Sequence, residues 1–271
     1  MLEKEFQARF NLLYPHLEEA GRQLRLLQRK RNFDARTKRD GSMVTDADDK
    51  MSHYWVELLT QAFPGETVIS EEQESTHIYD ARDSTIWYVD PIDGTSMFIQ
   101  GSPNYFVLIS LCLAGKASFG ILYQPERNCV LYGNPYIQPR LYTSYQNYRE
   151  IYKPASWHRQ LPLIVKGAPP TLRTRLEAVT HLPVRRTTGA AHNIISPLNG
   201  PISGFLSFRK TAYWDLAAPS AIMESAGFKT NMLYRGEPVR YNNGQVYCDR
   251  YYCLPPDTPA DVIDYVTTVT T

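Results

Sequence analysis

Long apolar runs are absent from this sequence. No stretch approaches the about 20 apolar residues of a membrane-spanning helix, so we expect no membrane span. The first residues, Met1 to Glu5, lack the apolar core of a signal peptide. Cysteines are few, with 4 in 271 residues, and none has the histidine neighbours of a zinc site. These absences predict a cytoplasmic protein in a reducing compartment.

A strong net charge is also absent. The chain carries 29 basic and 28 acidic residues, so no overall field favours a nucleic acid or a membrane surface as a partner. The basic run from Arg22 to Arg31 lacks the aromatic pattern of a nucleic-acid site, and we interpret it as the solvated face of a helix. An anionic ligand must therefore be held by a local site. With 43% hydrophobic residues, the chain can build one large domain or two packed ones.

Periodicity and turn residues predict an alternation of helices and strands. We divide the chain into an α+β half, 1–150, and an α/β half, 151–271, and we expect 134–160 to be a partly irregular connection. The predicted helices span residues 2–30, 48–63, 96–100, 170–178, 189–196, 214–226 and 259–267, and the predicted strands span residues 43–45, 67–70, 86–89, 105–113, 117–123, 129–132, 163–166, 184–188, 204–208 and 245–254.

One predicted strand end concentrates chemically useful groups. The apolar strand 86–89 should stop at Asp90-Pro91, because proline cannot donate to a ladder and restricts the residue before it. Asp93 follows three residues after Asp90, and Thr95 or Ser96 can cap a short helix. Carboxylates suit a divalent cation such as Mg²⁺, and helix-start N–H groups suit a phosphate. The same residues are also typical of an ordinary turn, so other segments must decide between the two.

Further charged residues fall near the ends of other predicted elements. Asp48 stands at the start of a helix, for which it can be the N-cap. Glu71 and Glu72 follow a short strand, and Asp215 lies at the opening of a later helix. Functional residues collect at such element ends on α/β scaffolds. Lys38 either reaches this site or lies in a solvated loop, and the sequence leaves both open.

The order of these segments resembles the inositol monophosphatase superfamily. Its first signature resembles Asp90-Pro91-Ile92-Asp93-Gly94-Thr95 behind an apolar strand. The segment from Lys38 to Asp48, the Glu71-Glu72 pair, and Trp214-Asp215 followed by Glu224 to Gly227 resemble the family in the same order. The resemblance implies a layered αβαβα sandwich and a Mg²⁺-dependent, mostly lithium-sensitive phosphomonoesterase that acts on a small phosphorylated metabolite. Homodimers are common in that superfamily.

The resemblance also implies roles for individual residues. Two or three Mg²⁺ ions would be bound, with Asp90 bridging two of them, and Asp48 and Thr95 would position and activate the attacking water. By the same resemblance the metal ligands are Glu71, Asp90, Asp93, Asp215 and the Ile92 main-chain carbonyl, the catalytic residues are Asp48, Thr95 and Glu71, and the substrate contacts are Gly94, Thr95, Gly189, Ala190 and Ala191.

Substrate choice divides the superfamily, and the sequence signals disagree. Ser70, Phe98-Ile99 and Thr211 resemble the 3′(2′),5′-bisphosphate nucleotidases, which convert adenosine 3′,5′-bisphosphate to AMP, although histidinol-phosphate phosphatases share Phe98-Ile99. Arg209-Lys210 departs from that branch, and these basic residues either bind a second phosphate or lie on the surface. Residues 188–191 look more like the inositol monophosphatases. We expect a bisphosphate nucleotidase; the alternatives are an inositol-1-monophosphatase, a histidinol-phosphate phosphatase, or a catalytically silent relative that binds a phosphorylated ligand.

Overall fold

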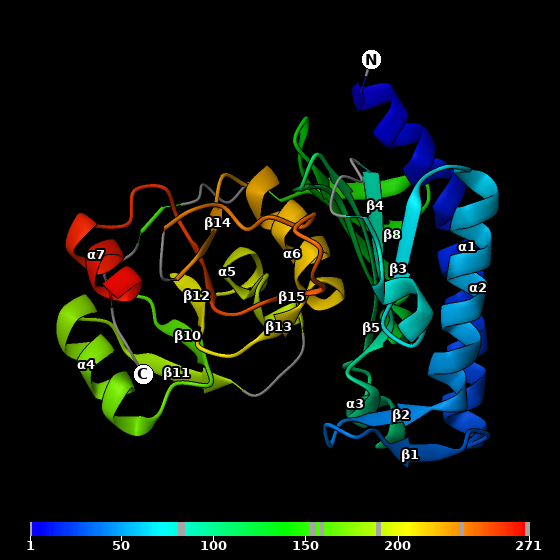
Figure 1. Cartoon of the computed structure of the whole chain (residues 1–271), viewed down its shortest axis with the longest axis horizontal. Coiled ribbons are helices and arrows are strands. Elements are labelled where there is room, and N and C mark those ends of the chain that lie inside the picture. Colours follow the sequence, from blue (N-terminus) through cyan, green and yellow to red (C-terminus); the bar gives the residue numbers. More distant parts are fainter. Residues whose placement is uncertain are drawn as a thin grey trace.

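The computed structural model describes residues 2–80, 85–151, 156–157, 160–187, 191–233 and 236–268. Within these residues, helices and sheets alternate in layers from one side of the molecule to the other (Figure 1). A seven-stranded sheet and a five-stranded sheet form the two β layers. No helix in the described ranges is both long and apolar enough to cross a membrane.

Two long helices cover one face of the seven-stranded sheet. α1 (Leu2–Lys30) confirms the predicted first helix and runs unbroken through Pro15 and Gly21. A Cβ atom on Gly21 would lie 1.9 Å from the Tyr123 hydroxyl oxygen, so glycine permits the close approach of α1 to the sheet. α2 (Asp46–Ala62) packs beside it and buries Met51, Trp55 and Leu59 against the same face. Two short paired strands, β1 (Ala35–Thr37) and β2 (Met43–Thr45), connect the helices.

The seven-stranded sheet corrects one prediction. Residues 137–150 form two antiparallel strands instead of an irregular connection, while 152–155 and 158–159 lie outside the described residues. These strands stand at the sheet's outer end, where β9 is mostly exposed and β8 buries only Pro139 and Tyr142, so they lack the apolar alternation that marks a half-buried strand. The strands, in spatial order, are β3 (Thr67–Ser70), β4 (Thr85–Asp93), β5 (Phe106–Leu113), β6 (Lys116–Gln124), β7 (Cys129–Asn134), β8 (Ile137–Ser144) and β9 (Asn147–Glu150).

Helix α6 (Tyr213–Ser225) covers the other face of this sheet, although it comes from the second half of the chain. A Cβ atom on Gly120 of β6 would lie 2.3 Å from the carbonyl oxygen of Ala218, so the helix backbone rests directly on the strand. Pro219 lies inside this helix, beyond its first turn, because α6 begins at Tyr213. Apolar packing on nearly every side of the helix outweighs the lost backbone hydrogen bond.

The five-stranded sheet forms the next layer and contains both parallel and antiparallel pairs. The predicted closing strand 245–254 is two separate strands: β15 (Tyr247–Cys248) pairs with β13 (Thr211–Ala212), and β16 lies inside the sheet. β14 (Lys229–Met232) was not predicted. β10 pairs in parallel with β11 and β12. The sheet order is β11 (Val184–Thr187), β10 (Leu163–Lys166), β12 (Gly204–Ser207), β16 (Tyr251–Leu254) and β14.

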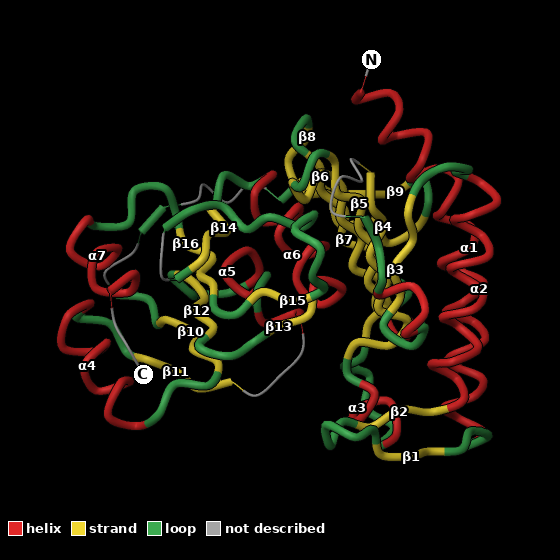
Figure 2. Tube along the Cα trace, in the orientation of Figure 1, coloured by secondary structure: helices red, strands yellow, loops and turns green. Residues whose placement is uncertain are grey.

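The outermost layer consists of α4 (Pro170–Thr180) and α7 (Ala260–Thr268), which pack on the far face of the smaller sheet (Figure 2). The predicted αβαβα sandwich is therefore confirmed. The predicted helix over 189–196 is wrong as a single element. Residues 188–190 lie outside the described ranges, Ala191–Asn193 is a 3-10 turn, and α5 (Ser196–Asn199) includes the proline that was expected to lie beyond the helix.

Candidate active site

Strand β4 carries the first two acids of the site and continues further than the sequence predicted. It runs through Pro91 to Asp93, and its pairing with β5 changes register between Asp90 and Asp93. Pro91 cannot donate to the ladder, which accounts for an irregularity at this point. The Ile92 N–H turns toward the Asp90 carboxylate, with 3.0 Å between nitrogen and oxygen. The irregularity therefore places two buried aspartates at the end of a central strand.

Three carboxylates from separate segments meet beside this strand. Glu71 follows β3, Asp90 lies in β4 and Asp215 lies in the first turn of α6, and one oxygen from each lies within 4.8 Å of the other two. Burial and the charges of the neighbouring acids raise the pKa of Asp90 well above its usual range. Burial, with a contribution from Glu71, raises the pKa of Asp215 to about 7. Carboxylate oxygens gathered in this way are typical of a divalent-cation site.

Asp93 lies next to this cluster and links the two halves of the chain. Its Oδ2 accepts a hydrogen bond from the Ala191 N–H at 2.9 Å. Burial and the charge of Asp215 raise its pKa, whereas the Ala191 N–H and the charge of Lys166 act in the opposite direction. Gly189 and Ala190, which were predicted to contact substrate together with Ala191, lie outside the described residues.

Asp48 and Thr95 form a hydrogen-bonded pair across 47 residues of sequence. Thr95 Oγ1 donates to Asp48 Oδ1 at 2.9 Å and also lies 3.1 Å from the Ile92 carbonyl oxygen. Burial raises the pKa of Asp48 to about 6, although hydrogen bonds from Thr45 and Thr95 oppose the shift. A buried carboxylate with this pKa can accept a proton that is relayed through the threonine hydroxyl.

The local helix starts differ from the predicted ones. The N-cap of α2 is Thr45, and Asp48 is the third residue of a capping box, in which it accepts from the Thr45 N–H at 2.8 Å. Asp48 is therefore held by its own helix start while its other oxygen faces Thr95. α3 (Thr95–Ile99) begins after Gly94, whose φ of 90° favours glycine, so neither Thr95 nor Ser96 is the N-cap.

Lys38 reaches the acidic cluster, which decides between the two roles that the sequence left open. Its ammonium nitrogen lies 2.6 Å from an oxygen of Glu71 and 2.6 Å from an oxygen of Glu72. Burial alone would lower the pKa of Lys38, but the two glutamates outweigh burial and raise it. A positive charge thus lies directly against two of the acids and offsets part of their negative charge.

An aromatic stack supports the site from the side of α6, and no sequence pattern predicted it. The rings of His77 and Trp214 stack with centroids 4.8 Å apart, and His77 Nε2 lies 2.8 Å from the Ser70 carbonyl oxygen. Trp214 precedes Asp215, and Ser70 precedes Glu71, so the stack joins the two segments that deliver these acids. His77 lacks metal-ligand spacing in the sequence, which is why it had no predicted role.

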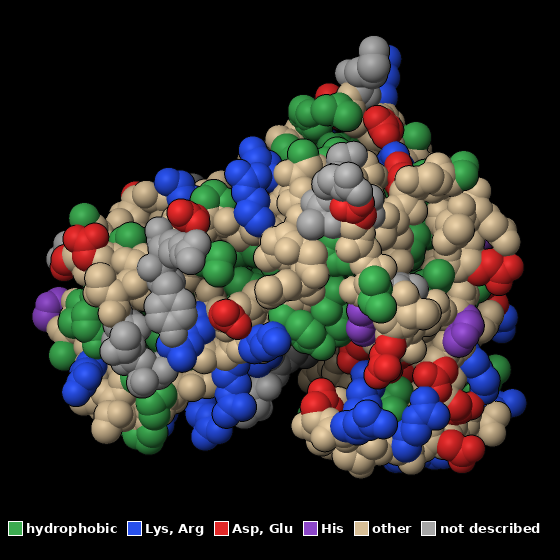
Figure 3. Space-filling view, in the orientation of Figure 1, with side chains coloured by type: hydrophobic (Ala, Val, Ile, Leu, Met, Phe, Trp, Pro, Cys, Tyr) green, Lys and Arg blue, Asp and Glu red, His purple; other side chains and the backbone are tan. Residues whose placement is uncertain are grey.

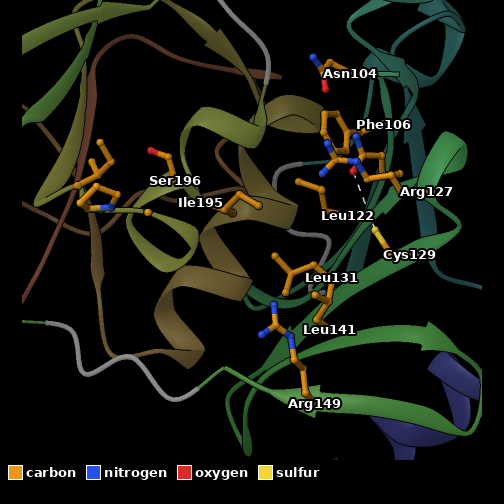
Figure 4. A pocket seen from close by; sticks show the side chains of 14 residues that line it. Asn104, Phe106, Leu122, Arg127, Cys129, Leu131, Leu141, Arg149, Ile195 and Ser196 are labelled. Carbon is orange, nitrogen blue, oxygen red and sulfur yellow. Dashed lines mark hydrogen bonds between the residues drawn. The ribbon is translucent and has the colours of Figure 1, made fainter. Parts of the chain in front are cut away.

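A cavity of about 580 Å³ lies elsewhere, between the seven-stranded sheet and α5. Phe106, Leu122 and Leu131 line it from the sheet and Ile195 lines it from the second half, as Figure 4 shows. No carboxylate belongs to its described lining. Its size exceeds that of the space beside Asp215, but its described lining includes Arg127 and Arg149, which would repel a cation, so the acidic cluster remains the candidate centre of chemistry.

Comparison with known proteins decides the family. The sequence model of the inositol monophosphatase family matches residues 11–258. The chain belongs to this family. It is therefore a phosphatase of a Mg²⁺-dependent family that hydrolyses phosphate monoesters. This assignment confirms the predicted enzyme class.

Relatives with different names match this phosphatase at similar levels. It is 25% identical over 259 residues to the 3′(2′),5′-bisphosphate nucleotidase CysQ of Aggregatibacter actinomycetemcomitans, covering 91% of this chain and 93% of the relative. It is 26% identical over 213 residues to the Nus factor SuhB of Haemophilus influenzae, covering 74% of this chain and 75% of that relative. The structure of an IMPase/NADP phosphatase complexed with NADP and Ca²⁺ superimposes with a TM-score of 0.80 at 16% identity, covering 98% of this chain and 97% of that structure. That likeness supports the shared fold.

Proposed function

We propose that this phosphatase holds Mg²⁺ at the acidic cluster and uses it to hydrolyse a small phosphate monoester. The observation that carries the proposal is the convergence of Glu71, Asp90 and Asp215 within 4.8 Å. The raised pKa values of Asp90 and Asp215 express mutual repulsion and burial, which a divalent cation would relieve. Asp93 and the Ile92 carbonyl complete the proposed ligand set, and we expect two or three ions.

The bound Mg²⁺ would neutralise the ester, lower the pKa of a water molecule and stabilise the departing alkoxide. The protein's own part begins at Thr95, whose hydroxyl donates to Asp48 and can therefore accept a proton from water. As the water oxygen attacks phosphorus, its proton passes through Thr95 to Asp48, and the P–O ester bond breaks. Solvent returns a proton to the alkoxide. The N–H groups of Gly94 and Thr95 would hold the phosphate oxygens, and Glu71 would assist through the metal.

For the substrate, we infer a 3′(2′),5′-bisphosphate nucleotide. Ser70, Phe98-Ile99 and Thr211 support this choice, as do relatives named CysQ that match most of the chain. Relatives named SuhB and inositol-1-monophosphatase match equally well. An inositol-1-monophosphatase or a histidinol-phosphate phosphatase is therefore the alternative, and a catalytically silent phospho-ligand-binding relative is the alternative of another class.

Several expectations from the sequence stay proposals beside this one. We propose inhibition by Li⁺, a cytoplasmic location and a homodimer. We also propose that the chain divides into subdomains 1–150 and 151–271, of which the second supplies Asp215. We also propose that Gly189, Ala190 and Ala191 contact the substrate. Of these three, the described Ala191 donates its N–H to Asp93.

A phosphate-release panel tests the proposed function. It contains adenosine 3′,5′-bisphosphate, inositol 1-phosphate, histidinol phosphate and fructose 1,6-bisphosphate, each with and without Mg²⁺. We expect Mg²⁺-dependent release that is fastest for the first ester. Asp93→Asn and Asp215→Asn should each lower kcat by about 100-fold or more, with an unchanged circular dichroism spectrum. Exposed Asp264 on α7 provides the matched control, Asp264→Asn. Hydrolysis of no ester would favour the silent relative instead.

A further inference from the structure

Two basic side chains stand at the edge of the active site without a described acidic partner. Arg209 and Lys210 form the turn between β12 and β13 and are exposed. β12 is parallel to β10, and the turn follows its carboxyl end, where ligands bind in open α/β sheets. Among the described residues, no carboxylate forms an ion pair with either side chain. They differ in this respect from Lys38, which forms ion pairs with both Glu71 and Glu72.

The turn is held in place by specific contacts. The Arg209 carbonyl oxygen lies 3.2 Å from Ser207 Oγ and 3.3 Å from Thr211 Oγ1, and both hydroxyls donate to it. The stem of Arg209 crosses Gly167, where a Cβ atom would lie 2.2 Å from Arg209 Cγ. The Lys210 ammonium lies 4.4 Å from the centre of the Tyr247 ring. Both basic groups are therefore oriented before any ligand arrives, which reduces the entropy lost on binding.

The same contacts connect the turn to the catalytic acids. The Tyr247 ring lies 5.7 Å from the ring of Trp214, the residue before Asp215. Burial raises the pKa of Tyr247, and the charges of Glu71 and Asp215 add to that shift, so the tyrosine lies within the field of the cluster. In Figure 3, basic side chains gather over β11 and β13, in the left part of the molecule that contains the five-stranded sheet. They border a notch at the lower edge of the view, and α3 borders the same notch from the other side.

We propose that Arg209 and Lys210 bind a second phosphate group of the substrate while the first phosphate lies at the acidic cluster. The proposal rests on the phosphatase site and extends it, because it assigns a substrate class, bisphosphates, to residues of this chain. Bound Mg²⁺ and the N–H groups of Gly94 and Thr95 would hold the phosphate that is cleaved. Two oriented positive charges at the rim are therefore available for another dianion, and a guanidinium suits phosphate oxygens especially well.

Calorimetric binding to the Mg²⁺-loaded Asp48→Asn protein tests this site directly, since we expect that variant to bind esters without hydrolysing them. The ligands form two matched pairs: adenosine 3′,5′-bisphosphate with adenosine 3′-phosphate, and fructose 1,6-bisphosphate with fructose 1-phosphate. We expect tighter binding of the bisphosphate in at least one pair. Adding Arg209→Gln and Lys210→Gln should reduce that preference about tenfold, and high salt should reduce it as well. Arg175→Gln with Lys229→Gln, at exposed positions on α4 and β14, should leave it unchanged.

The outcomes separate this inference from the proposed function. Preference for the fructose bisphosphate alone, lost in the double variant, supports the second-phosphate site and contradicts the nucleotidase. Equal binding within both pairs, or a preference that survives the double variant, overturns the inference even if every ester is hydrolysed. The exchange Arg209→Lys with Lys210→Arg keeps both charges and should retain most of the preference. Lys210→Gln alone gives the same test if the double variant fails to fold.

Discussion

The acidic cluster should make the metal-free protein less stable as the pH rises. Asp215 has a pKa of about 7 in the folded protein, against a usual value of 3.8, so the folded state holds more protons than the unfolded state between these values. Stability is therefore lost as the pH rises from about 4 to about 7. The raised pKa values of Asp90 and Asp93 have the same sign. This direction is opposite to that of most carboxylates, which are stabilised as anions by ion pairs.

The magnitude follows from the size of the shift. A rise of roughly 3 pKa units corresponds to about 4 kcal/mol for Asp215 as an upper limit. Its carboxylate is partly exposed and lies among other charged groups, so solvent screening reduces the expected effect to on the order of 2 kcal/mol. Asp215→Asn removes the charge with little change in shape. Without metal it should raise the free energy of unfolding at pH 8 by about this amount and change little at pH 4.

Urea unfolding of chelator-treated protein at pH 4, 6 and 8 measures the effect. The wild type should lose stability across this range, Asp215→Asn should lose less, and Asp264→Asn should follow the wild type. Mg²⁺ at about 100 times its dissociation constant should restore about 2.7 kcal/mol to the wild type at pH 8. If metal-free wild type and Asp215→Asn have parallel pH profiles, the acids do not repel one another as their geometry implies, and the argument for a cation at the cluster loses its main support.

Three further substitutions test the proton path and the position of α6. Asp48→Asn and Thr95→Ala should each lower kcat by about 10²- to 10⁴-fold with little change in KM, and activity in Thr95→Ala near that of the wild type would remove the threonine from the proton path. Gly120→Ala should destabilise the protein by about 1–3 kcal/mol, because its Cβ would lie 2.3 Å from the Ala218 carbonyl oxygen. Gly200→Ala is its control, since the nearest atom lies 3.6 Å away, and equal melting temperatures for the two variants would contradict the close packing of α6 on β6.

Apolar periodicity predicted those elements that bury one clear face. The helix 2–30 and the strand 67–70 are examples, and both are confirmed. Strands β8 and β9 were missed because few of their residues are buried, so apolar and polar residues do not alternate along them. The strand that was predicted to stop at Asp90-Pro91 continues to Asp93, because Asp90 and Asp93 still pair with Leu108 and Phe106 of β5 despite the missing donor.

The candidate acids could be named from the sequence, but their mutual arrangement could not. Motif order identified Glu71, Asp90 and Asp215, and the structure brings these three together. The contact between Lys38 and the glutamates depends on a loop whose path no local pattern determines. The same holds for the stacking of His77 on Trp214, which joins residues from different layers.

The position of α6 has a consequence for how the protein must be made. Because this helix covers a face of the seven-stranded sheet, a ribosome completes all seven strands, through Glu150, before the covering segment up to Ser225 has been synthesised. During that interval the nascent chain exposes an apolar sheet face, a condition that promotes aggregation. Arrival of α6 covers this face and brings Asp215 to Glu71 and Asp90 in one event, so the acidic cluster forms only once the sheet is protected.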